Sequence, residues 1–154
     1  MNFTDDNNYG GTMFAEMLSI ALDAHSRQTD KSGNPYFEHV MRVATPFLKA
    51  AKVDNAIVSL GHDLCEETWV TLGFLEDRFP EYIVEAIDAL TRREDETYRQ
   101  YIKRLCRNDI AREVKKFDIK DNLRPERMYK GAPIERYYRA LGWIHEYELT
   151  GKID

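Results

Sequence analysis

Residues 54–68 read DNAIVSLGHDLCEET, an apolar run that ends in a cluster of charged side chains. An aspartate side chain accepts hydrogen bonds from the free N–H groups of a helix N-terminus, so Asp54 predicts where a helix begins. The apolar residues that follow are Ile57, Val58 and Leu60. They predict a strongly apolar helix that runs to about Cys65.

Four titratable side chains lie at the end of this predicted helix, whose preceding turns are apolar. If the helix continues, His62 and Glu66 share one face, and Asp63 and Glu67 share the adjacent face. Burying such groups is costly unless a partner compensates them, and a divalent cation compensates imidazole and carboxylate together. A single His-Asp pair is a weak signal, so the metal hypothesis needs further ligands.

Apolar residues recur at helical spacing along the whole chain. The predicted helices cover residues 12–28, 36–52, 54–65, 71–79, 80–90, 98–105, 110–117 and 133–149. Pro46 is expected to kink the second helix, and Gly151 to end the last. No alternating strand pattern of useful length, internal repeat or linker stands out. The sequence therefore predicts an all-α fold, a single compact domain of about eight helices over residues 12–154, after a flexible tail at residues 1–11.

Two candidate ligands lie outside the central stretch. His39 comes early in a helix that follows a proline-bearing loop, and Asp118 comes four residues after Val114 on an otherwise apolar helix face. An acid that points toward the core or its edge needs a partner. Imidazoles and carboxylates together form a mixed nitrogen and oxygen set suited to a first-row divalent ion, with positions left for water and phosphate oxygen.

Composition restricts the class of protein. The chain has 154 residues, a net charge of −5 and two cysteines, Cys65 and Cys106, without the spacing of a metal site or a disulfide framework. The N-terminus lacks the pattern of a signal peptide, and no segment approaches 18 consecutive apolar residues. We expect a soluble, cytoplasmic protein. Its acidity argues against a partner such as duplex DNA.

Four segments resemble, in order, the hydrolase domain of RelA/SpoT-type stringent-response proteins and their small stand-alone relatives, which are phosphohydrolases of the HD superfamily. The segments are AHSRQ at 24–28, KSGNPYFEH at 31–39, GHDLCEET at 61–68 and VKKFDIKDNLR at 114–124. The family patterns are H-x-x-Q with G-x-P-Y-x-x-H, then H-D-x-x-E-D-T, then V-K-x-x-D-x-x-x-N-x-R. Several spaced motifs in the right order are far more specific than any one of them.

The resemblance implies a metal site and a reaction. His39, His62, Asp63 and Asp118 would ligate a divalent metal, typically Mn²⁺ in this family. Such a metal lowers the pKa of bound water and polarises a phosphoryl group. The residues expected around the water and the nucleotide are Glu66 and Glu67 as catalytic groups, and Asn122, Tyr137 and Arg124 as substrate-binding groups. Hydrolysis of the 3′-pyrophosphate of (p)ppGpp is the activity that the resemblance implies.

Two departures from the family pattern concern the substrate side. Asp23-Ala24 stands where the family usually has one or two basic residues, and Glu67 replaces the usual aspartate. Arg27 or Arg124 could supply the missing charge, and further candidate phosphate clamps are Arg92, Arg93, Lys103, Arg104, Arg107, Lys115 and Lys116. Two alternatives stay open: a hydrolase of another (d)NTP or signalling nucleotide, and a non-catalytic nucleotide-binding module. The oligomeric state is left open.

Overall fold

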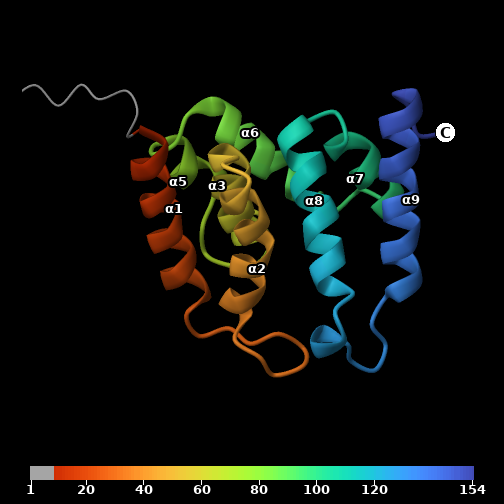
Figure 1. The fold of residues 1–154 in the computed structure, drawn as a ribbon, viewed down its shortest axis with the longest axis horizontal. Helices are drawn as coiled ribbons and strands as arrows, with labels where there is room; N and C mark the ends of the chain where they lie inside the picture. The colour runs from red at the N-terminus through yellow and green to blue at the C-terminus, as the bar shows by residue number, and fades with distance from the viewer. Residues whose placement is uncertain (1–8) are drawn as a thin grey trace, which may run out of the picture.

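The computed structural model describes residues 9–154, and their regular structure is helical, apart from one isolated bridge between Thr29 and Pro35 (Figure 1). The helices are α1 (Tyr9–His25), α2 (Tyr36–Lys49), α3 (Val53–Gly61), α4 (Leu64–Glu67), α5 (Leu72–Glu76), α6 (Glu81–Leu90), α7 (Tyr98–Leu105), α8 (Asp109–Asn122), the 3₁₀ helix η2 (Pro125–Arg127) and α9 (Ile134–Thr150). The all-α prediction is confirmed, with nine α-helices among the described residues. None of these helices is both long and apolar enough to span a bilayer.

Two groups of buried side chains form the interior, and α8 belongs to both. The first group joins α1, α2, α3, α5 and α6, and Ala111 and Val114 of α8 pack into it. The second joins α7 and α9, and Ile119 of α8 packs into it. Figure 1 shows α8 between these two halves of the molecule. Side chains on α8 therefore stand where the two halves meet.

The predicted helix at residues 54–65 is wrong at its end. Helix α3 ends at Gly61 and α4 begins at Leu64, with Asp63 at φ −106° and ψ 0°. Nδ1 of His62 lies 2.6 Å from the carbonyl oxygen of Ser59, so the side chain offers the last turn of α3 a partner that competes with helix continuation. His62 and Glu66 consequently do not share one helix face.

The starts of α1 and α3 also differ from the prediction, whereas the end of α9 agrees with it. Helix α1 already includes residues 9–11, which were predicted as tail, and the rest of that tail, residues 1–8, lies outside the described residues. Lys52 is the N-cap of α3, and Asp54 lies in its first turn, where a carboxylate favours the helix dipole. Gly151 ends α9 with φ 73°, as predicted, because glycine adopts this left-handed conformation without strain.

The loop between α1 and α2 contacts the segment that follows α8, at the same end of the molecule (Figure 1). The Ser32 hydroxyl donates to the Met128 carbonyl at 3.1 Å, and the Asn34 amide donates to the Glu126 carbonyl at 3.2 Å. Arg127 adds an ion pair with Asp30 at 3.4 Å. These contacts tie the two halves together beside α8.

Candidate active site

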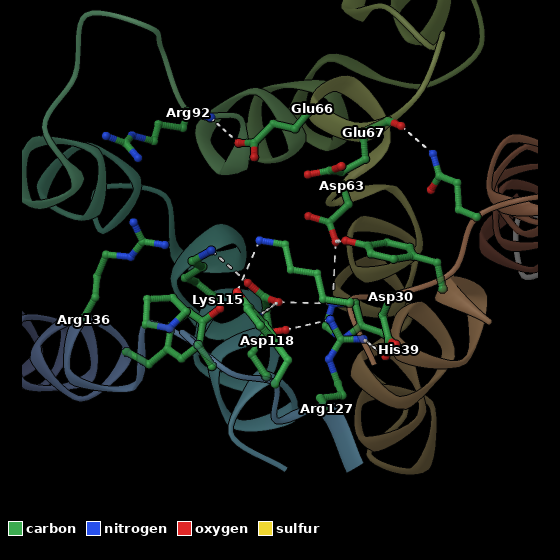
Figure 2. A pocket seen from close by; sticks show the side chains of 18 of the residues that line it. Asp30, His39, Asp63, Glu66, Glu67, Arg92, Lys115, Asp118, Arg127 and Arg136 are labelled. Carbon is green, nitrogen blue, oxygen red and sulfur yellow. Dashed lines mark hydrogen bonds and ion pairs between the residues drawn. The ribbon is translucent and has the colours of Figure 1, made fainter. Parts of the chain in front are cut away.

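A cavity of about 530 Å³ opens where the two halves meet. Its wall draws on the α1–α2 loop, on α2, α4, α7, α8 and α9, and on the loop after η2 (Figure 2). The predicted site residues in its lining are His39, Asp63, Glu66, Glu67, Asp118, Asn122 and Tyr137. Residues from distant parts of the sequence therefore meet in one space.

Two buried imidazoles and two aspartates converge at one side of this cavity. Nε2 of His39 lies 3.2 Å from Oδ1 of Asp118, and Nε2 of His62 lies 3.6 Å from the same oxygen. The ligand atoms of these three residues all lie within 4.8 Å of one another. Oδ2 of Asp63 lies 2.9 Å from Nε2 of His62 and 3.5 Å from Nε2 of His39. The four predicted ligands are thus together.

Hydrogen bonds at the far side of each ring orient the two imidazoles. Nδ1 of His39 lies 2.6 Å from Oδ2 of Asp121, and Nδ1 of His62 lies 2.6 Å from the Ser59 carbonyl oxygen. Both acceptors favour a proton on Nδ1, which leaves the Nε2 lone pair free to bind a cation. Nε2 of His62 is buried and makes no hydrogen bond within the described residues. This orphaned atom, beside two carboxylates, fits a bound divalent metal.

The charges at this centre are strongly coupled. Burial alone would raise the pKa of Asp118, but Lys115 and the two imidazoles hold it well below its usual range. Burial alone would lower the pKa of His39, but hydrogen bonds to Asp118, Asp121 and Asp63 outweigh it and raise the pKa to about 9. The carboxylates therefore stay ionised and demand positive charge, which protons or a metal can supply.

Asp121 is a site residue that the sequence reasoning missed. Its side chain is 6% exposed, and besides the His39 ring it accepts from Nε of Arg42 at 2.7 Å. A carboxylate that holds the distal nitrogen of a ligand histidine fixes the ring and raises its basicity. The signal that could have found it is its spacing, because Asp121 comes three residues after Asp118 on one helix.

Tyr36 lies in the KSGNPYFEH segment, and its position in the sequence predicted no role for it. Its hydroxyl donates to Oδ2 of Asp63 at 2.6 Å. Its ring lies between those of His25 and His39, with centroid distances of 5.0 and 5.7 Å. Tyr36 therefore holds Asp63 toward the imidazoles.

Glu66 and Glu67 reach the cavity from α4, as Figure 2 shows. The backbone N–H of Arg92 donates to Oε1 of Glu66 at 2.5 Å. Partial burial raises the pKa of both glutamates, and the charge of Asp63 raises it further. A carboxylate with a raised pKa is suited to take up and release a proton near neutral pH.

Among the predicted substrate residues, Asn122 lines the cavity between Asp118 and Arg127. Its amide donates to Oδ1 of Asp118 at 2.9 Å and accepts from Arg127 at 2.9 Å. Tyr137 also lines the cavity, from α9. The amide and the ring are therefore placed to contact a ligand held at the metal centre.

Arg27 and Arg124 are outside the cavity lining, contrary to expectation. Arg27 is exposed on the surface after α1. Arg124 lines a separate groove with Arg42 and lies 3.9 Å from Asp121, because α8 ends before it and the chain turns into η2. Arg127, one turn further on, takes the place that was expected for Arg124.

The other cations predicted to bind phosphate differ in whether they line the cavity. Arg92 and Lys115 line the cavity. Three others make ion pairs away from it: Arg93 with Asp88 at 2.8 Å, Arg104 with Glu96 at 2.5 Å and Lys116 with Glu148 at 2.5 Å. Lys31 and Arg136 line the cavity without having been predicted.

The geometry thus fits a divalent-metal centre beside two glutamates and several cations. Known proteins that are similar to this chain in sequence and in fold add to this picture. No protein-family model matches the chain. The bifunctional (p)ppGpp synthase/hydrolase SpoT of Escherichia coli (strain K12) is 33% identical over 75 residues, which are 47% of this chain and 10% of SpoT. A guanosine-3′,5′-bis(diphosphate) 3′-pyrophosphohydrolase of Aquifex aeolicus (strain VF5) is 28% identical over 117 residues, 68% of this chain and 16% of the relative.

Comparison with a solved structure extends the similarity to the fold. It is described as a metazoan ortholog of SpoT that hydrolyzes ppGpp, and it matches with a TM-score of 0.69 and 24% identity over 92% of this chain and 87% of that chain. The fold of this chain is therefore similar to that of the solved ortholog, as the motifs predicted. The chain spans only 10 to 16% of the length of these two curated relatives, so the similarity concerns a small part of each.

Proposed function

We propose that this chain is a divalent-metal-dependent phosphohydrolase that removes the 3′-pyrophosphate of (p)ppGpp. The observation that carries the proposal is the convergence of His39, His62, Asp63 and Asp118 at one side of a cavity that also holds Glu66. The names of the relatives, which include 3′-pyrophosphohydrolases, support the choice of substrate.

The metal would be held by Nε2 of His39 and His62 and by carboxylate oxygens of Asp63 and Asp118. A first-row ion suits this mixed set, and we propose Mn²⁺ as the resident metal. When bound, it would supply an acidified water and a polarised phosphoryl group. Tyr36 and Asp121 keep two of the ligands in place by hydrogen bonds to Asp63 and His39.

The protein side chains would supply proton transfer and substrate contacts. Glu66 or Glu67, with raised pKa, would take a proton from the attacking water and return one to the 3′-oxygen of the nucleoside as the 3′-oxygen–phosphorus bond breaks. Lys115, a cation 2.8 Å from Asp118, would stabilise negative charge on the phosphoryl group that the water attacks. Asn122 and Tyr137 would contact the nucleotide.

A second candidate is the hydrolysis of another nucleotide by the same chemistry. The observation that favours it is Asp23-Ala24, where the family usually has basic residues, together with Glu67. The non-catalytic alternative is weaker, because all four ligands and Glu66 are present. Cytoplasmic location and any self-association stay predictions.

The test is to incubate Mn²⁺-loaded protein with ppGpp, pppGpp and a panel of nucleoside triphosphates and to resolve the products by chromatography. We expect ppGpp and water to give GDP and pyrophosphate, and Asp118→Asn to give neither. Arg107→Gln is the control, because Arg107 is exposed and outside the cavity lining. Cleavage of another nucleotide without ppGpp would support the second candidate, and cleavage of none would overturn both.

A further inference from the structure

The cations that line the cavity differ in whether a carboxylate already neutralises them. Lys115 lies 2.8 Å from Asp118, and Arg127 lies 3.4 Å from Asp30. Within residues 9–154, Arg92 and Arg136 make no ion pair with a carboxylate, although both line the cavity. Lys31 makes none either, but it donates to the Tyr129 hydroxyl at 3.3 Å, and its charge acts on Glu67 at the other side of the cavity. The positive charges of Arg92 and Arg136 are therefore available to an anion that enters from solution.

These two arginines meet at one aromatic ring. The guanidinium carbon of Arg136 lies 4.8 Å from the ring centroid of Tyr98, and that of Arg92 lies 5.8 Å from it. The Arg92 side chain also donates to the backbone carbonyl of Glu96 at 2.8 Å, which positions the guanidinium without cancelling its charge. The face of the Tyr98 ring attracts both guanidinium groups, which helps to fix their positions. Arg92 and Arg136 therefore form a defined positive wall of the cavity.

This wall is separate from the metal centre. Figure 2 shows Arg92 and Arg136 at the left of the cavity, and Asp63, Glu67 and His39 at its right. The cavity would thus offer positive charge at two places, at a bound metal and at the two arginines. A ligand with two separated anionic groups is complementary to that arrangement.

We infer that Arg92 and Arg136 together bind a second phosphoryl group of the substrate, one that is not cleaved, and thereby select nucleotides that carry two separate phosphate groups. The inference rests on the proposed function for the identity of the cleaved group. In ppGpp the second group is the 5′-diphosphate. A guanidinium is suited to this role, because its planar fork makes paired hydrogen bonds to phosphate oxygens.

The same two arginines would replace the basic residues that the family usually has at the positions of Asp23 and Ala24 in α1. Asp23 is exposed, Ala24 is half-buried, and neither lines the cavity. Positive charge for the substrate comes instead from Arg92, after α6, and Arg136, on α9. Selectivity in this chain would accordingly depend on elements outside the family motifs.

A series of guanosine 3′-diphosphates tests the inference, with a 5′-diphosphate, a 5′-monophosphate or a free 5′-hydroxyl. For Arg92→Gln and Arg136→Gln we expect KM for the 5′-diphosphate substrate to rise about tenfold each, the scale of one charge-assisted contact to phosphate. KM for the 5′-hydroxyl substrate and kcat should change less than about twofold by the same reasoning, since no contact is lost there. Lysine at either position should restore part of the effect.

Salt gives an independent readout. Both arginines are exposed, so their attraction for phosphate is screened as the ionic strength rises. The preference of the wild type for the 5′-diphosphate over the 5′-hydroxyl substrate should fall with added salt, and that of the double glutamine variant should not. Arg107→Gln is the matched control, an exposed arginine outside the cavity lining.

The outcomes separate the inference from the proposed function. If the wild type cleaves ppGpp and the variants keep its preference, or if KM rises equally for all three substrates, the inference is overturned and the proposed function stands. If no substrate is cleaved, equilibrium dialysis with ppGpp still tests whether Arg92 and Arg136 bind its phosphate groups. Weaker binding to Arg136→Gln than to Arg107→Gln would then support the inference while the proposed function fails, and equal binding would overturn both.

Discussion

Replacing Asp121 with asparagine tests whether this residue orients a metal ligand. Asp121 is 6% exposed, its Oδ2 lies 2.6 Å from Nδ1 of His39, and its Oδ1 lies 2.7 Å from Nε of Arg42. An amide keeps the shape but loses the charge and one acceptor. We expect metal affinity to fall about 10- to 100-fold, the usual effect of removing a partner that holds a ligand histidine.

The same substitution should lower stability by a calculable amount. One buried hydrogen bond to a charged group contributes about 1.5–3 kcal/mol. The Arg42 side chain is 31% exposed, so its ion pair adds little to this sum. A domain of this size shifts by about 2–4 °C per kcal/mol, so the melting temperature of the metal-free protein should fall by about 3–12 °C.

Isothermal titration with Mn²⁺ and thermal unfolding with a chelator measure the two effects. Glu113→Gln is the matched control, because Glu113 lies on the same helix and makes an exposed ion pair with Lys52 at 2.9 Å. Such a pair contributes only about 0–1 kcal/mol. If Asp121→Asn bound Mn²⁺ as tightly as the wild type, the orienting role would be refuted.

Five further outcomes follow from the structure. Asp63→Ala should abolish metal occupancy and activity, and full occupancy by metal analysis would contradict its role as a ligand. Removing the metal from the wild type should lower its melting temperature, because a ligand at 100 times its Kd stabilises the folded protein by about 2.7 kcal/mol. Glu66→Gln should keep the metal but lose about 10²- to 10⁴-fold in kcat, whereas metal loss would make Glu66 a ligand or support. The pKa of Glu66 is raised above its ordinary value of 4.5, and only the ionised carboxylate can act as a base. We therefore expect kcat/KM to fall as the pH drops through a point above 4.5. If this fall were unchanged in Glu66→Gln, another group would be responsible for it. Gly61→Ala should destabilise the fold by about 1–3 kcal/mol in urea titration, because the added Cβ would lie 2.7 Å from Cδ1 of Ile87, while Gly142→Ala, with open space around its Cβ, should not.

Periodicity predicted the helices well where an apolar stripe decides the structure. It failed between His62 and Leu64, because the pattern of apolar residues alone does not reveal that an imidazole bonds a carbonyl of its own helix. The four candidate ligands could be named because each motif has a fixed local order. Their mutual distances, by contrast, depend on how α2, α3 and α8 pack, which no single segment contains.

Substrate-side residues were harder to predict for a related reason. Arg124 was favoured because it follows Asn122 in one motif, but the chain leaves the helix there and Pro125 opens η2. Helical spacing no longer applies beyond that point, and Arg127 is the residue that returns to the cavity. Arg136 lies on another helix altogether, so nothing in its local sequence links it to Arg92.

Helix α8 links the candidate metal ligands to the residues proposed to contact the nucleotide. Val114 and Ile119 fix it in the two interior groups, and between and beside them Lys115, Asp118 and Asn122 face the cavity. Since buried interiors are close-packed, a displacement of either half moves this helix. Asp118 would then shift relative to His39, which belongs to the first half, and Asn122 relative to Tyr137, which belongs to the second. The position of the candidate metal ligands and the width of the cavity therefore depend on the same helix, so a change in either half affects both.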